Sequence, residues 1–175
     1  IYLLSIGYAV PGLILAVGMV QLMVFLDANV FLGFEFVLTG SLFGLILAYI
    51  IKTYALANSS IESGYERLSH ALDDSAKLLG SSGFRMLKNV HIPLLKTSIL
   101  TSVLLVMSDV VKELPATLIL RPFNFETLAV STYTYASEER MLQAAAPAIA
   151  IVLIGLIPIV FLSKMIRSSR PVEEK

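Results

Sequence analysis

The sequence predicts an all-α, polytopic membrane protein with about four transmembrane helices. Hydrophobic residues make up 57% of the 175 residues and charged residues 15%, against ~45–50% and ~25% in soluble domains. Several runs with few or no charges reach the ~20 residues that a helix needs to cross a bilayer. One long polar stretch, residues 59–93, divides these runs into two pairs.

The composition excludes several classes of function. Net charge is zero and cysteine is absent, which removes a basic surface for nucleic acid, thiol catalysis and cysteine metal sites. No glycine-rich phosphate loop ending in Gly-Lys-Ser/Thr occurs, so ATP binding by this chain is not expected. The only histidines, His70 and His91, lack partners for a metal site, and we interpret both as surface or groove residues.

The first predicted span covers residues 1–26, which contain no charged residue. Pro11 and Gly12 fall in its middle, and two interpretations remain open: a kink that shapes a pathway, or ordinary tolerance of these residues in a membrane helix. Because the chain begins at Ile1 inside an apolar run, we expect it to be a piece of a longer protein.

The second predicted span covers residues 36–56, after a connection at 27–35 that lacks Lys and Arg. Small residues near its start favour close packing of another helix; they are Gly40, Ser41 and Gly44. Lys52 lies near its predicted end, where a lysine side chain reaches the membrane interface.

The polar stretch predicts a pair of helices. Apolar residues recur at steps of three and four from Ile61 to Leu79, which predicts an amphipathic helix over Ser60–Leu79. Ser59 with Glu62 is a capping-box pattern, and Gly80 is a suitable left-handed terminator. A second helix is expected over Gly83–Asn89, and Pro93 is placed to begin the next span.

The third predicted span runs from residue 94 to 111–113 and ends in a charged cluster. Asp109 and Lys112 are three residues apart and can pair on one helical face. This pair is either an ordinary interfacial salt bridge or, with Glu113, part of an outward gate, since a charge at this depth should face protein or a wet cavity.

Residues 112–137 form neither a clean span nor a polar loop. Pro115 and Pro122 interrupt helices there, and such a segment must be buried in protein or line a cavity. The candidates for the path or gate are Asp109, Lys112, Glu113, Pro115 and Thr117. The tyrosines Tyr133 and Tyr135 belong either to an interface belt or to the cavity.

The fourth predicted span covers residues 141–163, and a mixed-charge tail follows. Positive charge gathers in and beside the polar stretch and in this tail; the residues are Lys52, Arg67, Lys77, Arg85, Lys88, Lys96, Lys164, Arg167, Arg170 and Lys175. Because Lys and Arg mark the cytoplasmic side, residues 59–93 and the C-terminus are predicted to be cytoplasmic.

The polar stretch also resembles a family motif. It contains Asp74-Ser75-Ala76, three residues, Gly80, nine residues, Val90, one residue and Ile92-Pro93. This is similar to the EAA loop of binding-protein-dependent ABC transporter permeases, written Glu-Ala-Ala, three residues, Gly, nine residues, Ile, one residue, Leu-Pro. The spacing is intact and the four departures are mild. The alternative is an amphipathic helix on the lipid surface, which does not explain the glycine corner.

The resemblance implies a permease of the bacterial cytoplasmic (inner) membrane whose polar loop couples to a separate ATPase subunit. ATP and Mg would then be held by that partner, with no cofactor on this chain. Further implied partners are a periplasmic or lipoprotein solute-binding protein, a second permease half or copy, and the bilayer. The implied contact residues are Asp74, Ser75, Ala76, Leu79, Gly80, Phe84, Arg85, Leu87 and Pro93.

A second, less specific resemblance concerns the substrate. Lys112-Glu113-Leu114-Pro115-Ala116-Thr117-Leu118, Arg121-Pro122-Phe123 and Thr127-Leu128-Ala129 are similar to the iron(III)-type permeases of that family. Relatives for thiamine, phosphonate, molybdate or sulfate remain alternatives. Two further classes stay open, an ion-coupled secondary carrier that uses the cluster at 109–113 and a membrane scaffold without a pathway.

Overall fold

The computed structural model describes residues 7–29 and 37–169 of the chain, and within them all regular secondary structure is helical. The elements are α2 Gly12–Asn29, α3 Leu42–Tyr65, α4 His70–Leu78, α5 Gly83–Met86, the π-helical η1 Leu87–His91, α6 Ile92–Val111, α7 Pro115–Leu120, α8 Leu128–Ser137 and α9 Met141–Ser169. Four described helices are long and apolar enough to cross a membrane: Gly12–Asn29, Leu42–Tyr65, Gly83–Val111 and Met141–Lys164. The predicted all-α, polytopic class is confirmed.

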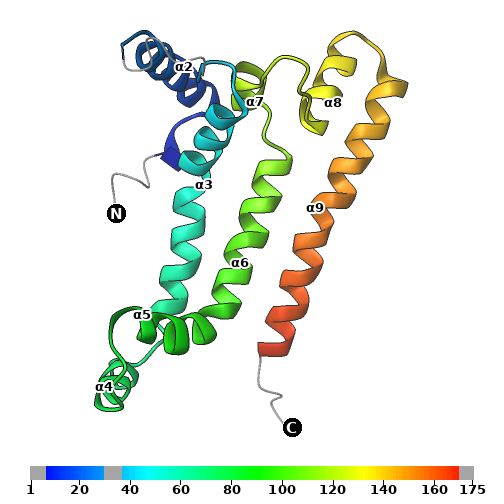
Figure 1. Cartoon of the computed structure of the whole chain (residues 1–175). Coiled ribbons are helices and arrows are strands. Elements are labelled where there is room, and N and C mark those ends of the chain that lie inside the picture. Colours follow the sequence, from blue (N-terminus) through cyan, green and yellow to red (C-terminus); the bar gives the residue numbers. More distant parts are fainter. Residues whose placement is uncertain (1–6, 30–36, 170–175) are drawn as a thin grey trace.

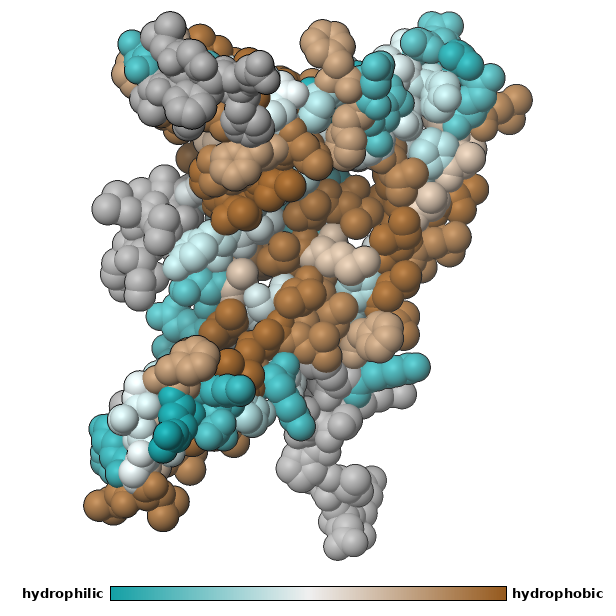
Figure 2. Space-filling view, viewed as in Figure 1, coloured by the Kyte–Doolittle hydropathy of each residue, from teal (hydrophilic) through white to brown (hydrophobic). Residues whose placement is uncertain are grey.

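The long helices α3, α6 and α9 stand beside one another (Figure 1). The short helices α4 and α5 lie at one end of this group, which we call the α4 end. Helices α2, α7 and α8 lie at the opposite end, which we call the α7 end. The surface between the two ends is mostly apolar in Figure 2, whereas hydrophilic residues gather at the ends. This distribution suits a bundle whose sides face hydrocarbon.

Small residues bring α3 and α6 together. A Cβ on Gly64 would lie 2.6 Å from the Cβ of Ser98, so only glycine fits this crossing. The Ser60 hydroxyl donates to the Ser98 carbonyl at 3.2 Å, and the Ser102 hydroxyl donates to the Ala57 carbonyl at 3.3 Å. The pair of helices α3 and α6 therefore has the close, hydrogen-bonded packing typical of membrane helices.

At the other end of α3, α2 packs against it through Gly44, whose Cβ would lie 2.5 Å from Met23 Cε. The other two small residues act differently from the prediction. Gly40 sits in the preceding turn with φ +69° and open space around it. The Ser41 hydroxyl caps α3 by accepting from Gly44 N at 3.2 Å.

The first predicted span, 1–26, is interrupted at Pro11, where the prediction left a kink open. Residues 7–9 are helical, Val10 forms a bend, and α2 begins only at Gly12. Pro11 has no amide hydrogen to give to the preceding turn, which explains the break. Residues 1–6 and 30–36 lie outside the described residues, so the rest of this span and most of the 27–35 connection are not described.

The predicted boundary between the second span and the polar stretch is wrong. Helix α3 runs on to Tyr65, the chain turns at residues 66–69, and only then does α4 begin. Ser59 does not cap a helix; its hydroxyl donates to the Leu56 carbonyl at 3.1 Å. The amides after Ser59 are already bonded within α3, so no free helix start exists for it to cap.

Of the later boundaries, two helix starts agree with the prediction and the other limits differ. The short helix begins at Gly83 as predicted, but it continues through η1 into α6 without an interruption before residue 94. Pro122 lies in the 121–127 link between α7 and α8, and Pro115 is the first residue of α7, after α6 has ended at Val111, so the helices are interrupted near both prolines as predicted. The fourth span begins at Met141 as predicted and its helix extends to Ser169. Residues 170–175 of the predicted tail lie outside the described residues.

Candidate functional site

A glycine corner ends α4. Gly80 has φ +80°, and a Cβ there would meet nothing within 4 Å, so backbone conformation and not space calls for glycine. Ser81 N donates to the Ala76 carbonyl and Gly80 N donates to the Lys77 carbonyl, both at 2.9 Å. These two bonds are the Schellman pattern, which satisfies the last carbonyls of a helix. The predicted terminator is confirmed.

Large apolar side chains are exposed on both sides of this corner. Leu78 is 90% exposed, Leu79 86% and Phe84 77%. We call these three residues the apolar tip. Leu79 and Phe84 were predicted as contact residues, but Leu78 was missed because the predicted periodic helix placed it off the apolar face.

The other predicted contact residues differ in how far they are exposed. Asp74 is exposed and pairs with Lys77 at 3.4 Å, and Arg85 is exposed. Ala76 is buried, whereas the Ser75 hydroxyl donates to the Ala71 carbonyl at 2.7 Å. Leu87, 45% exposed, lies in η1, and Pro93 is among the first residues of α6.

His91 was predicted to be a surface or groove residue, and it is only slightly exposed. Its side chain is 12% exposed, and Nε2 lies 2.8 Å from Asp73 Oδ1. The His91 ring also meets the Tyr65 ring edge to face, with centroids 5.5 Å apart. The contact of His91 with Asp73 was not predicted, because spacing along the chain does not show that α4 folds back beside η1. The side chain of His70 is outside the described residues.

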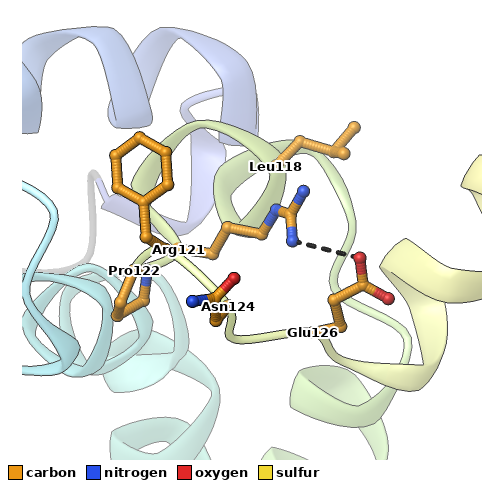
Figure 3. Close-up of a pocket in the computed structure, with 6 residues that line it drawn as sticks. Leu118, Arg121, Pro122, Asn124 and Glu126 are labelled. Atoms are coloured by element: carbon orange, nitrogen blue, oxygen red, sulfur yellow. Dashed lines mark hydrogen bonds and ion pairs between the residues drawn. The ribbon is translucent and has the colours of Figure 1, made fainter.

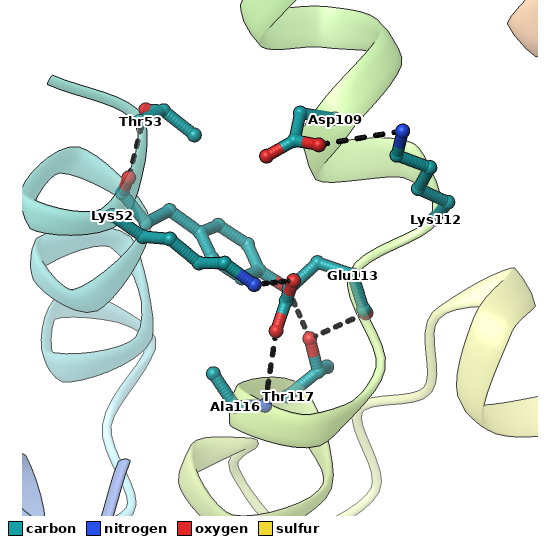
Figure 4. A network of polar contacts seen from close by, with 8 residues as sticks. Lys52, Thr53, Asp109, Lys112, Glu113, Ala116 and Thr117 are labelled. Atoms are coloured by element: carbon teal, nitrogen blue, oxygen red, sulfur yellow. Dashed lines mark hydrogen bonds and ion pairs between the residues drawn. The ribbon is translucent and has the colours of Figure 1, made fainter. Parts of the chain in front are cut away.

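A buried polar network occupies the junction of α3 and α7 at the α7 end (Figure 4). Lys52 Nζ forms an ion pair with Glu113 Oε2, and the two side chains are 17% and 8% exposed. Ala116 N donates to Glu113 Oε1 at 3.1 Å, and the Thr117 hydroxyl donates to the Glu113 carbonyl at 2.9 Å. Tyr49 and Thr117 share a hydroxyl hydrogen bond of 2.5 Å. We call Tyr49, Lys52, Glu113 and Thr117 the Lys52 network.

Gly12 covers the ion pair from the side of α2. A Cβ at this position would lie 2.9 Å from Glu113 Oε1 and 3.2 Å from Lys52 Nζ. Three helices therefore close around one pair of charges. An ion pair this deeply buried tolerates little change, because removing one partner leaves an uncompensated charge.

The prediction for Lys52 was wrong, because it placed this residue near a helix end at the membrane interface. Because α3 runs from Leu42 to Tyr65, Lys52 lies near the middle of the helix and its side chain turns inward. One feature of the sequence could have pointed to its partner: Glu113 is an acidic residue next to an apolar segment. Only the fold brings the two charges together across 61 residues of sequence.

The predicted gate cluster divides into two groups. Asp109 and Lys112 pair at 3.4 Å, as predicted, and Lys112 is 65% exposed. Glu113 instead joins Lys52, and Thr117 is fully buried. Pro115 is the first residue of α7. In the described chain, Glu113 and Thr117 are therefore buried and bonded to other groups of the protein.

The link between α7 and α8 carries an open depression of about 310 Å³ (Figure 3). Arg121 Nη1 donates to the Phe125 carbonyl at 3.1 Å and lies 3.4 Å from Glu126 Oε1. Phe123 in this link is fully exposed. Within the described ranges, no group of three or more His, Asp or Glu side chains is placed to hold a metal ion.

The comparisons with known proteins agree with this architecture. The family model described as binding-protein-dependent transport system inner membrane component matches residues 2–168. The chain belongs to this family. It is therefore a multi-pass component of an ABC transport system and not an enzyme.

Among similar proteins is the Fe(3+)-transport system permease protein FbpB 2 of Haemophilus influenzae, 26% identical over 157 residues, which are 90% of this chain and 29% of that protein. Another is the putative 2-aminoethylphosphonate transport system permease protein PhnV of Salmonella typhimurium, 28% identical over 120 residues, 69% of this chain and 45% of that protein. The chain thus spans less than half the length of either relative.

Proposed function

We propose that this chain forms part of the translocation path of an ABC importer and receives motion from a separate ATPase subunit through residues 66–91. The observation that carries the proposal is the apolar tip. Three large apolar side chains stand exposed on a rigid corner, at a hydrophilic end of the molecule. Large apolar side chains that are exposed together mark sites of interaction with a protein or a membrane.

In this proposal the corner transmits force. The Schellman bonds at Gly80 fix the angle between α4 and α5, and the helix continues from Gly83 to Val111 into the membrane bundle. The α4 end and the C-terminus face the cytoplasm, where Lys and Arg gather. The ATPase subunit holds the ATP and Mg, and a solute-binding protein docks at the α7 end.

The proposed gate lies at the α7 end. Asp109, Lys112 and Pro115 stand where α6 gives way to α7, and the Lys52 network fixes that junction. Thr117 and Glu113 belong to the wall that supports the path. A second permease half or copy would supply its other side.

The proposed substrate is iron(III), with a phosphonate as the second candidate. The named iron relative covers 90% of this chain, and the phosphonate relative covers 69%. The experiment is ATP-driven uptake into liposomes by the full transporter, with radioactive Fe(III) citrate and 2-aminoethylphosphonate offered separately. Iron uptake supports the first candidate, and phosphonate uptake in its place overturns it.

The coupling claim has its own test. Replacing Gly80 by valine forces a β-branched residue into positive φ, which costs on the order of 1–2 kcal/mol and distorts the corner. We expect uptake to be lost while membrane insertion stays intact, as judged by the amount of folded protein in the membrane. Wild-type uptake in this variant would contradict coupling through the corner. Uptake that needs a proton gradient but no ATPase would indicate a secondary carrier.

A further inference from the structure

Three elements meet at the imidazole of His91. The residue is the last of η1, its Nε2 lies 2.8 Å from Asp73 Oδ1 of α4, and its ring meets Tyr65 at the end of α3 with an interplanar angle of 84°. The His91 and Asp73 side chains are 12% and 25% exposed. We call His91, Asp73 and Tyr65 the His91 clamp.

The clamp bridges a gap in the fold. Helix α4 leaves α3 through the turn at residues 66–69, and a hollow of about 260 Å³ lies between them. Tyr65, Glu66, Leu68, Ser69 and Asp73 line this hollow. Because this hollow separates α4 from the end of α3, the contact of Asp73 with His91 is a direct side-chain link between α4 and the base of α6.

The π-helical geometry of η1 makes this support necessary. A π turn contains an extra residue, helices kink at such turns, and these turns recur at functional sites. Pro93 follows two residues later and removes another backbone donor. The chain changes direction between α5 and α6 (Figure 1), and this joint is a place where the helix can bend unless side chains from elsewhere brace it.

We propose that His91 is a positioning residue that locks α4 to α6, so that a displacement of the apolar tip moves α6 instead of bending the chain at η1. The inference rests on the proposed coupling function and adds a residue to it. Neither charge state of His91 is required, because a neutral imidazole N–H and an imidazolium both donate to the Asp73 carboxylate. The claim concerns the link between α4 and α6 and assigns His91 no contact with the ATPase.

The test measures motion directly in the complete transporter in liposomes. Ala71 in α4 and Met107 near the outer part of α6 are both exposed, and this chain has no cysteine of its own. Spin labels on Ala71→Cys and Met107→Cys report the distance between the two helices with and without trapped ATP and vanadate. Copurification of the ATPase subunit is measured on the same samples.

We expect the distance between the labels to be the same with and without trapped nucleotide when His91 is present, because the clamp makes α4 and α6 one body. In His91→Ala the distance should change on trapping, and the uptake of Fe(III) citrate per ATP hydrolysed should fall at least ~5-fold, the lower range of coupling between sites. His91→Gln, which keeps a donor for Asp73, should restore the fixed distance. Lys88→Ala, an exposed neighbour in η1, is the matched control.

A distance in His91→Ala that stays as fixed as in the parent protein overturns the proposal. If His91→Ala fails to insert, His91→Phe keeps the ring on Tyr65 without the hydrogen bond and gives the same reading. Failure of the parent protein to bind any ATPase subunit is a different result. It would reject the proposed function, and the clamp with it.

Discussion

The two ends of the molecule invert the usual distribution of side chains. At the α7 end, the charged Lys52 and Glu113 are buried and paired. At the α4 end, the apolar Leu78, Leu79 and Phe84 are exposed. Charges inside and large apolar groups outside both carry a cost. The ion pair within the chain offsets the cost of burying the two charges. The apolar groups are removed from water only when a partner covers the tip.

This difference separates two consequences of mutation. The Lys52 network is held by hydrogen bonds and an ion pair within this chain, so damage there should lower the free energy of unfolding. The apolar tip contributes little to the fold, so damage there should weaken a complex and leave the isolated chain stable. The α3–α6 hairpin lies between these regions and should show an intermediate effect.

The largest expected effect is in the Lys52 network. Glu113→Ala leaves the Lys52 ammonium buried without its counterion, and breaking a buried pair costs ~3–5 kcal/mol of stability. Unfolding in detergent by denaturant, followed by circular dichroism, measures this loss. The double variant Lys52→Met/Glu113→Leu removes both charges and should recover most of it. Equal loss in the single and double variants would show that the charges are not the reason for the effect.

The intermediate effect is expected at the helix crossing. Gly64→Leu brings a Cβ within 2.6 Å of Ser98 Cβ, and overpacking of this kind costs ~1–3 kcal/mol. The same unfolding measurement applies. Gly18→Leu, at a position where a Cβ meets nothing within 4 Å, is the matched control and should change little. Equal stability of the two variants would contradict the close α3–α6 contact.

The smallest effect on stability is expected at the tip. Leu79→Ser should alter the free energy of unfolding by less than ~0.5 kcal/mol, because the side chain is 86% exposed. Its affinity for the ATPase subunit should fall at least ~10-fold, as for an interface anchor worth more than ~1.4 kcal/mol. Titration of the ATPase subunit against the purified protein measures this. A lower free energy of unfolding in Leu79→Ser, together with an unchanged affinity for the ATPase subunit, would contradict the comparison.

The sequence predicted the elements better than their boundaries. Run length and charge were sufficient for the all-α, membrane-spanning class, and the glycine at 80 was correctly placed as a helix terminator because positive φ is a local requirement. The boundary at Ser59 was wrong because a local capping pattern has no effect inside a helix that is already hydrogen-bonded.

The missed parts of the candidate site depend on distant contacts. Lys52 was separated from its partner by 61 residues and His91 from Asp73 by 18. The pair Asp109 and Lys112 was predicted because three residues along a helix fix their proximity. Only tertiary packing decides whether the next acidic residue, Glu113, joins them or turns to another helix.

The most direct test of the account uses two exposed phenylalanines, one at each end. Phe84, at the α4 end, is 77% exposed and Phe123, in the link between α7 and α8, is fully exposed. Phe84→Cys and Phe123→Cys are treated with a membrane-impermeant maleimide on intact cells, and then with a cross-linker in the purified transporter. We predict that Cys at 123 reacts from outside, whereas Cys at 84 reacts only after permeabilisation and cross-links to the ATPase subunit. Labelling of position 84 from outside, or cross-linking of the ATPase to position 123, would contradict the account.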